Sequence, residues 1–499
     1  FRLGRYPIHF HLNGDVSGSY VRGCGIHHTF NRAVTIHAVD NLLVEHNVAF
    51  DIMGHAYFME DGIEMGNIIQ YNLGIFVKSS SSLLNVDITP ATFWVTNPNN
   101  TVRHNAAAGG THFGYWYNMP NHPGGPSFTT SMCPRKMVMG EFYNNSAHSF
   151  GWYGLWIFPE YHPMEGGGCD SNTPTQAKFY GLTAWQVERG AEALEVGGVQ
   201  FHDFLISDAD QAGFEYQVVD SGIPFDNDGA LIKDSVVIGY SALTHSNRSY
   251  TCTKAGVHCP KSKGLTIDGV KFINFDQDCC ATFRSCAHCK PDQGGFQART
   301  KNLVFSNSPN KAFFKWEHEY WYEDLDGSFT GTANHIVLPD NPNLPPDHCS
   351  RDDAYSLGVP GASCDNTIKL HRMSFNGVAP TSLKYKDTLF TNEHGTSRIP
   401  YHLKRITHPE GWMITLIDGD TYNFFFEHAD HVTNITYNSR FDGFSDGDFV
   451  IINHNLTQRP DHFETTDVSR NNSMNMLTYE NNDYGDWHFD NETKDLFYL

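Results

Sequence analysis

Short stretches of alternating side chains recur along this chain, and each is opened by a small residue or proline. A period of two residues is that of a β-strand with one buried face. Strands that recur in one register predict a solenoid built from stacked repeats. The eight openers are Pro7, Ala33, Ala56, Gly74, Gly114, Gly154, Ala191 and Gly213.

A second repeat places an Asn, Asp or Gly at the end of a β-rich segment, at intervals of 22 to 39 residues. These residue types accept left-handed backbone conformations and satisfy their own turns with side-chain hydrogen bonds. Coils of strands and turns stacked at such a period form a parallel β-helix. The turn residues are Asn47, Asn72, Asn105, Asn144, Gly181, Asp203, Asp234 and Asp268.

The repeat divides the chain into three regions. We predict a right-handed parallel β-helix over residues 1–335, interrupted by disulfide-stapled and Pro/Gly-rich insertions, and a linker or long loop over residues 336–366. Alternating strands with short polar turns then predict a small antiparallel β-sandwich domain over residues 367–499, incomplete at its C-terminus. The predicted fold class is all-β.

The alternation also assigns faces to each strand. The first and third residues after each opener are mostly apolar and are expected to face the core. The second residues form one outward column, with His9, Thr35, Phe58, Phe76, Trp116, Trp156, Ala193 and Glu215. The fourth residues form another, with His11, His37, Glu60, Lys78, Asn118, Phe158, Glu195 and Gln217.

Histidines and carboxylates gather at the start of these columns. Since neighbouring coils are about 4.8 Å apart, His11, His37 and Glu60 are expected to touch, with His9 beside them. His9, His11, His37 and Glu60 are therefore candidate ligands of a divalent cation, calcium or zinc. Equally, Glu60, Asp61 and His37 are candidate catalytic acids and bases. The alternative is a hydrogen-bonded ladder that serves stability alone.

An outward aromatic row follows the histidines. Exposed aromatic side chains in a line suggest a surface for stacking sugar rings, unless the insertions at about residues 79–100, 119–139 and 159–176 cover them. Basic side chains beside the aromatic row are candidates for binding a carboxylate through charged hydrogen bonds. The candidate ligand-binding residues are Phe58, Phe76, Trp116, Trp156, Arg32 and Lys78.

Asn-x-Ser/Thr sequons indicate a glycosylated extracellular chain. The predicted acceptors are Asn99, Asn247, Asn434, Asn455, Asn471 and Asn491, and a seventh sequon falls on Asn144 in the turn column.

Eleven cysteines agree with an oxidising compartment. We expect disulfides between Cys252 and Cys259, between Cys349 and Cys364, and between Cys133 and Cys169, with Cys24 as a buried odd thiol. A further cysteine group comprises Cys279, Cys280, Cys286 and Cys289, for which disulfides are favoured over a zinc site.

Net charge and hydropathy limit the classes of molecule that this chain is expected to bind. The formal net charge of −22 disfavours nucleic acid and anionic membranes. It would also repel a polyanionic glycan unless basic residues or a metal lie in the site. No stretch approaches the ~18 apolar residues of a membrane span, and the sequence begins with neither methionine nor a signal peptide. We expect a segment of a longer chain, attached to a membrane only through parts outside this sequence.

Several strings resemble a known family: GRYPIHFHLNGDV, YVRGCGIHHTFNRAVTIH, GHAYFMEDGIE and GEFYNNSAHS. They are similar to the β-helix segment of the fibrocystin-L family, and to the matching segment of the cell migration-inducing and cell-surface hyaluronidases. The resemblance implies the ectodomain of a single-pass membrane protein, described in that family as a coat component of hair-cell stereocilia. The resemblance to the hyaluronidases implies an endo-acting glycosidase that cleaves hyaluronan. The matching residues are His9, His11, His27, His28, Arg32, His37, His55, Glu60 and Asp61.

Two functional hypotheses follow. The first is a rod-like extracellular module of a coat or adhesion protein that binds glycans, such as hyaluronan or other matrix components, along its histidine and aromatic face. The second is a hyaluronan-degrading endo-glycosidase with its site on the same face.

Overall fold

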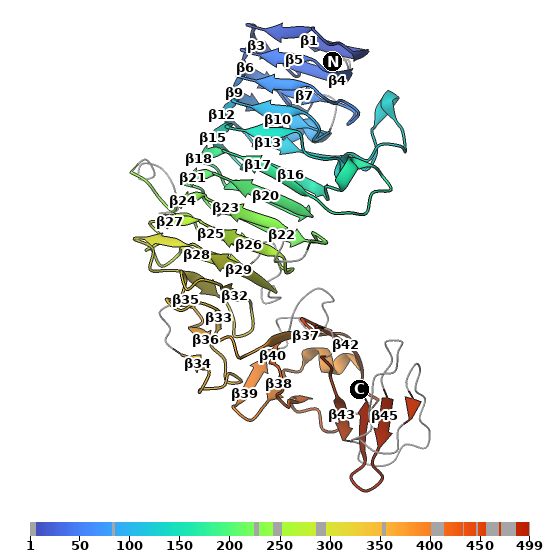
Figure 1. The fold of residues 1–499 in the computed structure, drawn as a ribbon, viewed down its shortest axis with the longest axis vertical. Coiled ribbons are helices and arrows are strands. Elements are labelled where there is room, and N and C mark those ends of the chain that lie inside the picture. The colour runs from blue at the N-terminus through green and yellow to red at the C-terminus, as the bar shows by residue number, and fades with distance from the viewer. Residues whose placement is uncertain are drawn as a thin grey trace. The chain divides into compact units, whose positions relative to one another are not determined.

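The computed structural model describes residues 6–81, 85–223, 229–242, 252–285, 296–351, 356–400, 414–432, 434–445, 448–455, 469–470 and 486–498. Apart from short 3-10 turns, these residues form strands and loops. Three long sheets run along the first part of the chain and wind as a parallel β-helix (Figure 1). The predicted fold class is confirmed. Among the described residues, no helix has the length and apolar character needed to cross a lipid bilayer.

From β1 to β30, each coil contributes one strand to each of the three sheets, and the later strands β31 to β36 join only the first or the second sheet. The first sheet consists of β1 (Ile8–Asp15), β4 (Val34–Asp40), β7 (Tyr57–Met59), β10 (Ala91–Val95), β13 (Phe113–Tyr117), β16 (Tyr153–Tyr161), β19 (Arg189–Val196), β22 (Ala212–Val219), β25 (Ala255–Cys259), β28 (Ala281–Ser285), β31 (Ala312–Phe314) and β35 (Ser356–Gly358). The second consists of β2 (Tyr20–Arg22), β5 (Leu43–Glu45), β8 (Ile68–Gln70), β11 (Thr101–Arg103), β14 (Glu141–Tyr143), β17 (Gln176–Tyr180), β20 (Gly198–His202), β23 (Ala230–Lys233), β26 (Leu265–Asp268), β29 (Gln297–Lys301), β32 (Trp321–Asp324), β33 (His335–Pro339), β36 (Gly361–Cys364) and β34 (Cys349–Ser350). The third consists of β3 (Gly25–Thr29), β6 (Val48–Met53), β9 (Leu73–Lys78), β12 (Ala106–Gly110), β15 (Ser146–Phe150), β18 (Thr183–Trp185), β21 (Leu205–Ser207), β24 (Val236–Ile238), β27 (Lys271–Ile273) and β30 (Val304–Ser306).

The core fills the space between the three sheets. Inward residues of the first sheet stack from coil to coil: the rings of Tyr57, Phe93 and Tyr115 lie face to face, with centroids 4.8 Å apart at each step. All three are almost completely buried. Each such side chain contributes about 1.5–3 kcal/mol through burial, so the repeated apolar positions hold the coils together.

Buried asparagines form a ladder at the corner between the second and third sheets. The Nδ2 atom of Asn47 donates to Oδ1 of Asn72 at 2.9 Å, and that of Asn72 donates to Oδ1 of Asn105 at 3.1 Å. Asn105 donates in turn to Asn145. This corrects the predicted turn column, because Asn144 occupies the left-handed position with φ 50° and Asn145 carries the ladder.

Two strands depart from the predicted alignment. Phe76 and Lys78 belong to β9 in the third sheet, so they do not continue the outward columns of the first sheet. The strand that follows β7 there is β10, which was expected to be an insertion. At β19 the prediction was wrong by one residue: Ala191 pairs with Leu155, and Glu192, not Ala193, follows Trp156 in the outward column.

Three disulfides staple the described insertions. The predicted bonds Cys133–Cys169 and Cys349–Cys364 are confirmed. Cys252 pairs with Cys280 and not with Cys259, because Cys259 lies inside β25 with its side chain in the core. Cys24 is only half-buried. Cys286 and Cys289 lie outside the described residues.

The predicted glycosylation sites are partly described. Asn99, Asn434, Asn491 and the turn residue Asn144 are exposed. Asn455 lies in β43, and Asn247 and Asn471 lie outside the described residues.

The region expected to be a linker, residues 336–366, contains paired strands. β33, β36 and β34 extend the second sheet in antiparallel fashion. Leu338 and Leu344 share a buried cluster with Ile368 and Leu370. The remaining strands are β37 (Leu370–Ala379), β38 (Thr388–Thr391), β39 (Thr396–Ile399), β40 (Ile414–Ile417), β41 (Asn423–Phe426), β42 (Thr436–Asp442), β43 (Ile452–Asn455), β44 (Ser469–Arg470), β45 (Asp486–Phe489) and β46 (Asp495–Tyr498). The 3-10 turns are η1 (Asn85–Ile88), η2 (Gly125–Ser127), η3 (Pro134–Lys136), η4 (Glu165–Gly167) and η8 (Thr381–Tyr385).

Small antiparallel sheets follow the β-helix. They have the orders β40-β37-β42, β39-β38-β41 and β43-β46-β45-β44, the last containing one parallel pair. Contacts divide the chain into two compact units, Phe1–Arg440 and Phe441–Leu499. The first two small sheets therefore lie largely in the same unit as the β-helix.

Candidate metal centre

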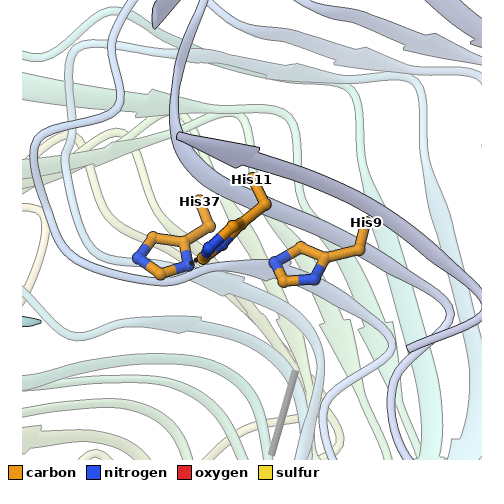
Figure 2. Close-up of side chains that lie close together, drawn as sticks. All are labelled: His9, His11 and His37. Carbon is orange, nitrogen blue, oxygen red and sulfur yellow. Dashed lines mark hydrogen bonds between the residues drawn. The ribbon is translucent and has the colours of Figure 1, made fainter. Parts of the chain in front are cut away.

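The first coils bring three histidines together on the outer face of the first sheet. His9 and His11 project from β1, and His37 projects from β4, where it is the direct register partner of His11. The Nδ1 atoms of His11 and His37 are 3.0 Å apart. One nitrogen from each of the three rings lies within 4.8 Å of the others, and Figure 2 shows the rings converging. His11 is exposed, His9 half-buried and His37 buried.

Two carboxylates complete the cluster. The chain leaves β7 in ladder register, with the Glu60 amide donating to the Ile36 carbonyl. This brings Oε2 of Glu60 within 3.3 Å of Nδ1 of His37. The next residue, Asp61, places Oδ2 2.9 Å from Nε2 of the same ring. A carboxylate oxygen accepts, so Nε2 of His37 carries a proton, and in the neutral ring Nδ1 presents its lone pair between His11 and Glu60.

The turn that carries these carboxylates is held by a buried glutamate. Oε1 of Glu64 accepts from the amides of Ala38 and Asp61, and Oε2 accepts from Gly62. Burial raises the pKa of the Glu64 carboxyl above its ordinary value. Burial also raises the pKa of Glu60, reinforced by Asp61 and opposed by His37. The site therefore contains carboxyl groups that hold protons more firmly than in water.

The donor set fits a transition metal better than calcium. At a tetrahedral zinc with Zn–N bonds of about 2.0–2.1 Å, two ligand nitrogens are about 3.3 Å apart. The 3.0 Å between His11 and His37 needs only a small widening to reach that spacing. Imidazoles favour zinc, whereas calcium needs six or more oxygens. His9, His11 and His37 are thus suited to hold zinc, while Glu60 contacts His37 and Asp61 orients the His37 ring from behind.

Arg32 is not available at the surface to bind the carboxylate of a ligand. It is fully buried, paired with Asp87 of η1, and its guanidinium lies 3.7 Å from the centroid of the Phe58 ring. His55 is buried beside the same pair and accepts the Ala91 amide proton at Nδ1. Burial, together with Arg32, lowers the pKa of His55 well below its ordinary value. These residues anchor η1 under the site.

The predicted aromatic platform is mostly covered. The row on the first sheet runs through Phe58, Trp94, Trp116 and Trp156. Phe58 and Trp116 are only 3% and 4% exposed, because they pack in a cluster with Phe113 and neighbouring rings. Trp94 was missed because its strand lies within a predicted insertion. Phe76 is 49% exposed on another sheet, where Lys78 pairs with Asp51.

A second charged cluster lies farther along the same column. Glu192 and Glu215 are register partners on β19 and β22, and both contact Nε of Arg189, at 3.3 and 2.6 Å. His258 of β25 lies 3.4 Å from Glu215. Glu192 is only 2% exposed. The sequence did not predict this cluster, because the one-residue error at β19 placed Ala193 in the outward column instead of Glu192. The cluster is closed to solvent and resembles a buried ion network.

The fold is a parallel β-helix, and its first coils are similar to a known β-helix family. Residues 1–155 match the family model described as CEMIP beta-helix. Over its whole length the chain is similar to human fibrocystin-L, with 47% identity covering 100% of this chain and 12% of that protein. The predicted resemblance to fibrocystin-L and to the hyaluronidases is therefore confirmed.

Two further relatives match about a third of this chain. The human cell surface hyaluronidase CEMIP2 is 36% identical over 31% of this chain and 14% of its own length. The human cell migration-inducing and hyaluronan-binding protein is 37% identical over 30% of this chain and 13% of its own length. The chain thus spans about one eighth of the length of these relatives. The family model over residues 1–155 includes the three histidines of the candidate site.

Proposed function

We propose that this chain is an extracellular β-helix module of a large cell-surface protein, and that its first coils bind a glycan carboxylate through a zinc ion held by His9, His11 and His37. The convergence of His11 and His37 at 3.0 Å, with Asp61 behind His37, carries this proposal. The similarity to fibrocystin-L and to a hyaluronan-binding relative supports the setting.

The negative net charge of the chain explains why a bound metal ion would be needed to attract an anionic glycan. The chain has a formal net charge of −22 and would repel a polyanion such as hyaluronan. A divalent cation on the exposed side of the site reverses the local charge. Since Arg32 is buried and Lys78 lies on another sheet, the metal is the cation best placed to receive a carboxylate at this cluster.

The test measures zinc and glycan binding separately. Zinc binding to the whole chain is followed by calorimetry, and hyaluronan binding is followed with and without a chelator. The variant His11→Ala/His37→Ala is expected to lose both, while His27→Ala, an exposed histidine of β3, retains both. Hyaluronan binding that survives the chelator and the double variant would refute the metal-centred proposal.

Hydrolysis is the second candidate function, favoured by the position of the Glu60 and Asp61 carboxylates on either side of the His37 ring, where an acid and a base could act together. High-molecular-weight hyaluronan is incubated with the whole chain and with His37→Ala/Glu60→Ala, and chain length is followed on gels. Shortening only by the parent chain supports hydrolysis. Intact chains with both proteins would leave binding alone as the function.

A further inference from the structure

We infer that the insertion between β13 and β14, residues 119–139, is a strap that positions the histidine site: Gly124 and Gly125 clamp Asp61, and Asp61 fixes His37. This inference rests on the proposed metal site. It assigns a role to a segment four coils away along the chain from His11, which sequence reasoning treated only as a covering loop.

Glycines of the strap touch Asp61 directly. The amide of Gly124 donates to the Asp61 carbonyl at 2.8 Å. A Cβ at Gly125 would lie 2.7 Å from Oδ1 of Asp61, closer than real side chains approach. Gly125 also has φ 53°, a conformation that glycine adopts at no steric cost. The Gly125 backbone thus lies against the Asp61 carboxylate, and a side chain at this position would displace that carboxylate.

Prolines of the strap secure the neighbouring residue. A Cβ at Gly62 would meet Cγ of Pro120 at 2.8 Å and Cγ of Pro134 at 3.5 Å, so both rings pack against the Gly62 backbone. The carbonyl of Gly62 accepts from Asn97, which precedes β11. The turn carrying Asp61 is therefore enclosed by the strap on one side and by the next coil on the other.

The strap is itself tied to the insertion of the following coil. Cys133 forms a disulfide with Cys169, and Nζ of Lys136 donates to the Cys169 carbonyl at 2.6 Å. The amide of His162 donates to the Arg135 carbonyl at 2.9 Å. A loop tethered at these points can hold Asp61 at a fixed position, because few backbone torsions remain free.

Fixing Asp61 has a chemical consequence at His37. The 2.9 Å contact to Nε2 selects the tautomer that leaves the Nδ1 lone pair directed at His11. If the carboxylate moves, the ring can exchange tautomers and rotate, and a ligand nitrogen is lost for part of the time. Outer contacts of this kind change metal affinity by about 10- to 100-fold.

The experiment compares two glycine substitutions in the whole chain. Gly125→Ala forces the Asp61 carboxylate away. Gly166→Ala is the matched control, because Gly166 also has a positive φ, 71°, and lies in the neighbouring insertion, but a Cβ there meets nothing within 4 Å. Two quantities are measured: zinc affinity, and the ¹⁵N chemical shifts of the His37 ring in metal-free protein, which report the tautomer.

We expect Gly125→Ala to weaken zinc binding by about 10- to 100-fold and to mix the His37 tautomers, while Gly166→Ala matches the parent in both. An unchanged zinc affinity and an unchanged His37 tautomer in Gly125→Ala would overturn the inference that the strap positions Asp61. If the parent binds no zinc, the metal proposal fails, but the tautomer measurement still decides the strap. Should Gly125→Ala not fold, Pro120→Ala removes the ring from Gly62 and is expected to shift both measurements in the same direction.

Discussion

The Nε2 atom of His37 lies 2.9 Å from Oδ2 of Asp61, while Nδ1 of the same ring faces His11 at 3.0 Å. One imidazole therefore joins a buried carboxylate to an exposed histidine. The arrangement determines both the proton position on His37 and the direction of its lone pair, and it is the basis of the first prediction.

Asp61→Asn is expected to lower zinc affinity by about 10- to 100-fold with little change in melting temperature, because the amide keeps the shape but loses the charge that orients His37. Calorimetric titration and a thermal melt measure the two effects. Asp15→Asn, an exposed aspartate at the end of β1, is the control. Equal affinities in all three proteins would show that Asp61 does not tune the site.

Arg32→Met is expected to destabilise the first coils by about 3–5 kcal/mol, because it leaves the buried Asp87 carboxylate without its guanidinium. Denaturant unfolding followed by tryptophan fluorescence measures the change. Replacing both partners by apolar residues should recover part of the loss. Arg103→Met interrupts a half-exposed pair with Glu141 and should cost less than about 1 kcal/mol. A similar cost for both arginines would contradict this account.

Glu192 predicts a pH dependence of stability. Burial, followed by the charge of Glu215, raises the pKa of Glu192 to about 7. The folded protein then holds a proton that the unfolded chain releases near its ordinary pKa of 4.5. Stability should therefore fall as the pH rises from about 4.5 to 7, by up to about 3 kcal/mol.

Glu192→Gln should remove that decline and be more stable than the parent at pH 8, as measured by urea unfolding across the pH range. Glu215 behaves in the opposite way. Burial tends to raise its pKa, but His258 and Arg189 outweigh burial and lower it to about 2, so its contribution is lost as the pH falls below about 4.5. A decline above pH 4.5 that persists unchanged in Glu192→Gln would rule out Glu192 as its source.

Asn72→Ala is expected to cost about 2–5 kcal/mol, because it leaves the amide and the side-chain Nδ2 of Asn47 without their shared acceptor inside the corner. Asn121→Ala, at an exposed asparagine of the strap, should change stability by less than about 0.5 kcal/mol. Chemical denaturation compares the two variants. If Asn72→Ala lowers the free energy of unfolding no more than Asn121→Ala does, the asparagine ladder does not stabilise the stacking of the coils.

Sequence periodicity predicted much of the candidate site. The two-residue alternation identified the outward faces of β1, β4 and β7, and the coil spacing then placed His11, His37 and Glu60 in one column. The positions of the cysteines separately predicted two of the three described disulfides. These successes depend on local pattern, because a strand's buried face and a cysteine's neighbours in an adjacent insertion follow from short-range order.

Periodicity could not decide which sheet a strand joins. LGIFVK alternates as the strands of the first sheet do, yet it forms β9 in the third sheet, and Trp94 takes the place expected for Phe76. Since all three sheets bury one face against the same core, their strands carry the same pattern. A one-residue slip at β19 likewise exchanged Ala193 for Glu192, because the side chains of a strand alternate between faces.

The sequence by itself therefore determined an all-β solenoid and its outward histidine column. Only the tertiary structure decided that Arg32 is buried against Asp87, that the aromatic row is covered, and that Gly125 closes on Asp61. The physical reason is that alternation is encoded residue by residue, whereas desolvation and contact depend on which distant segments the completed coils bring against one another.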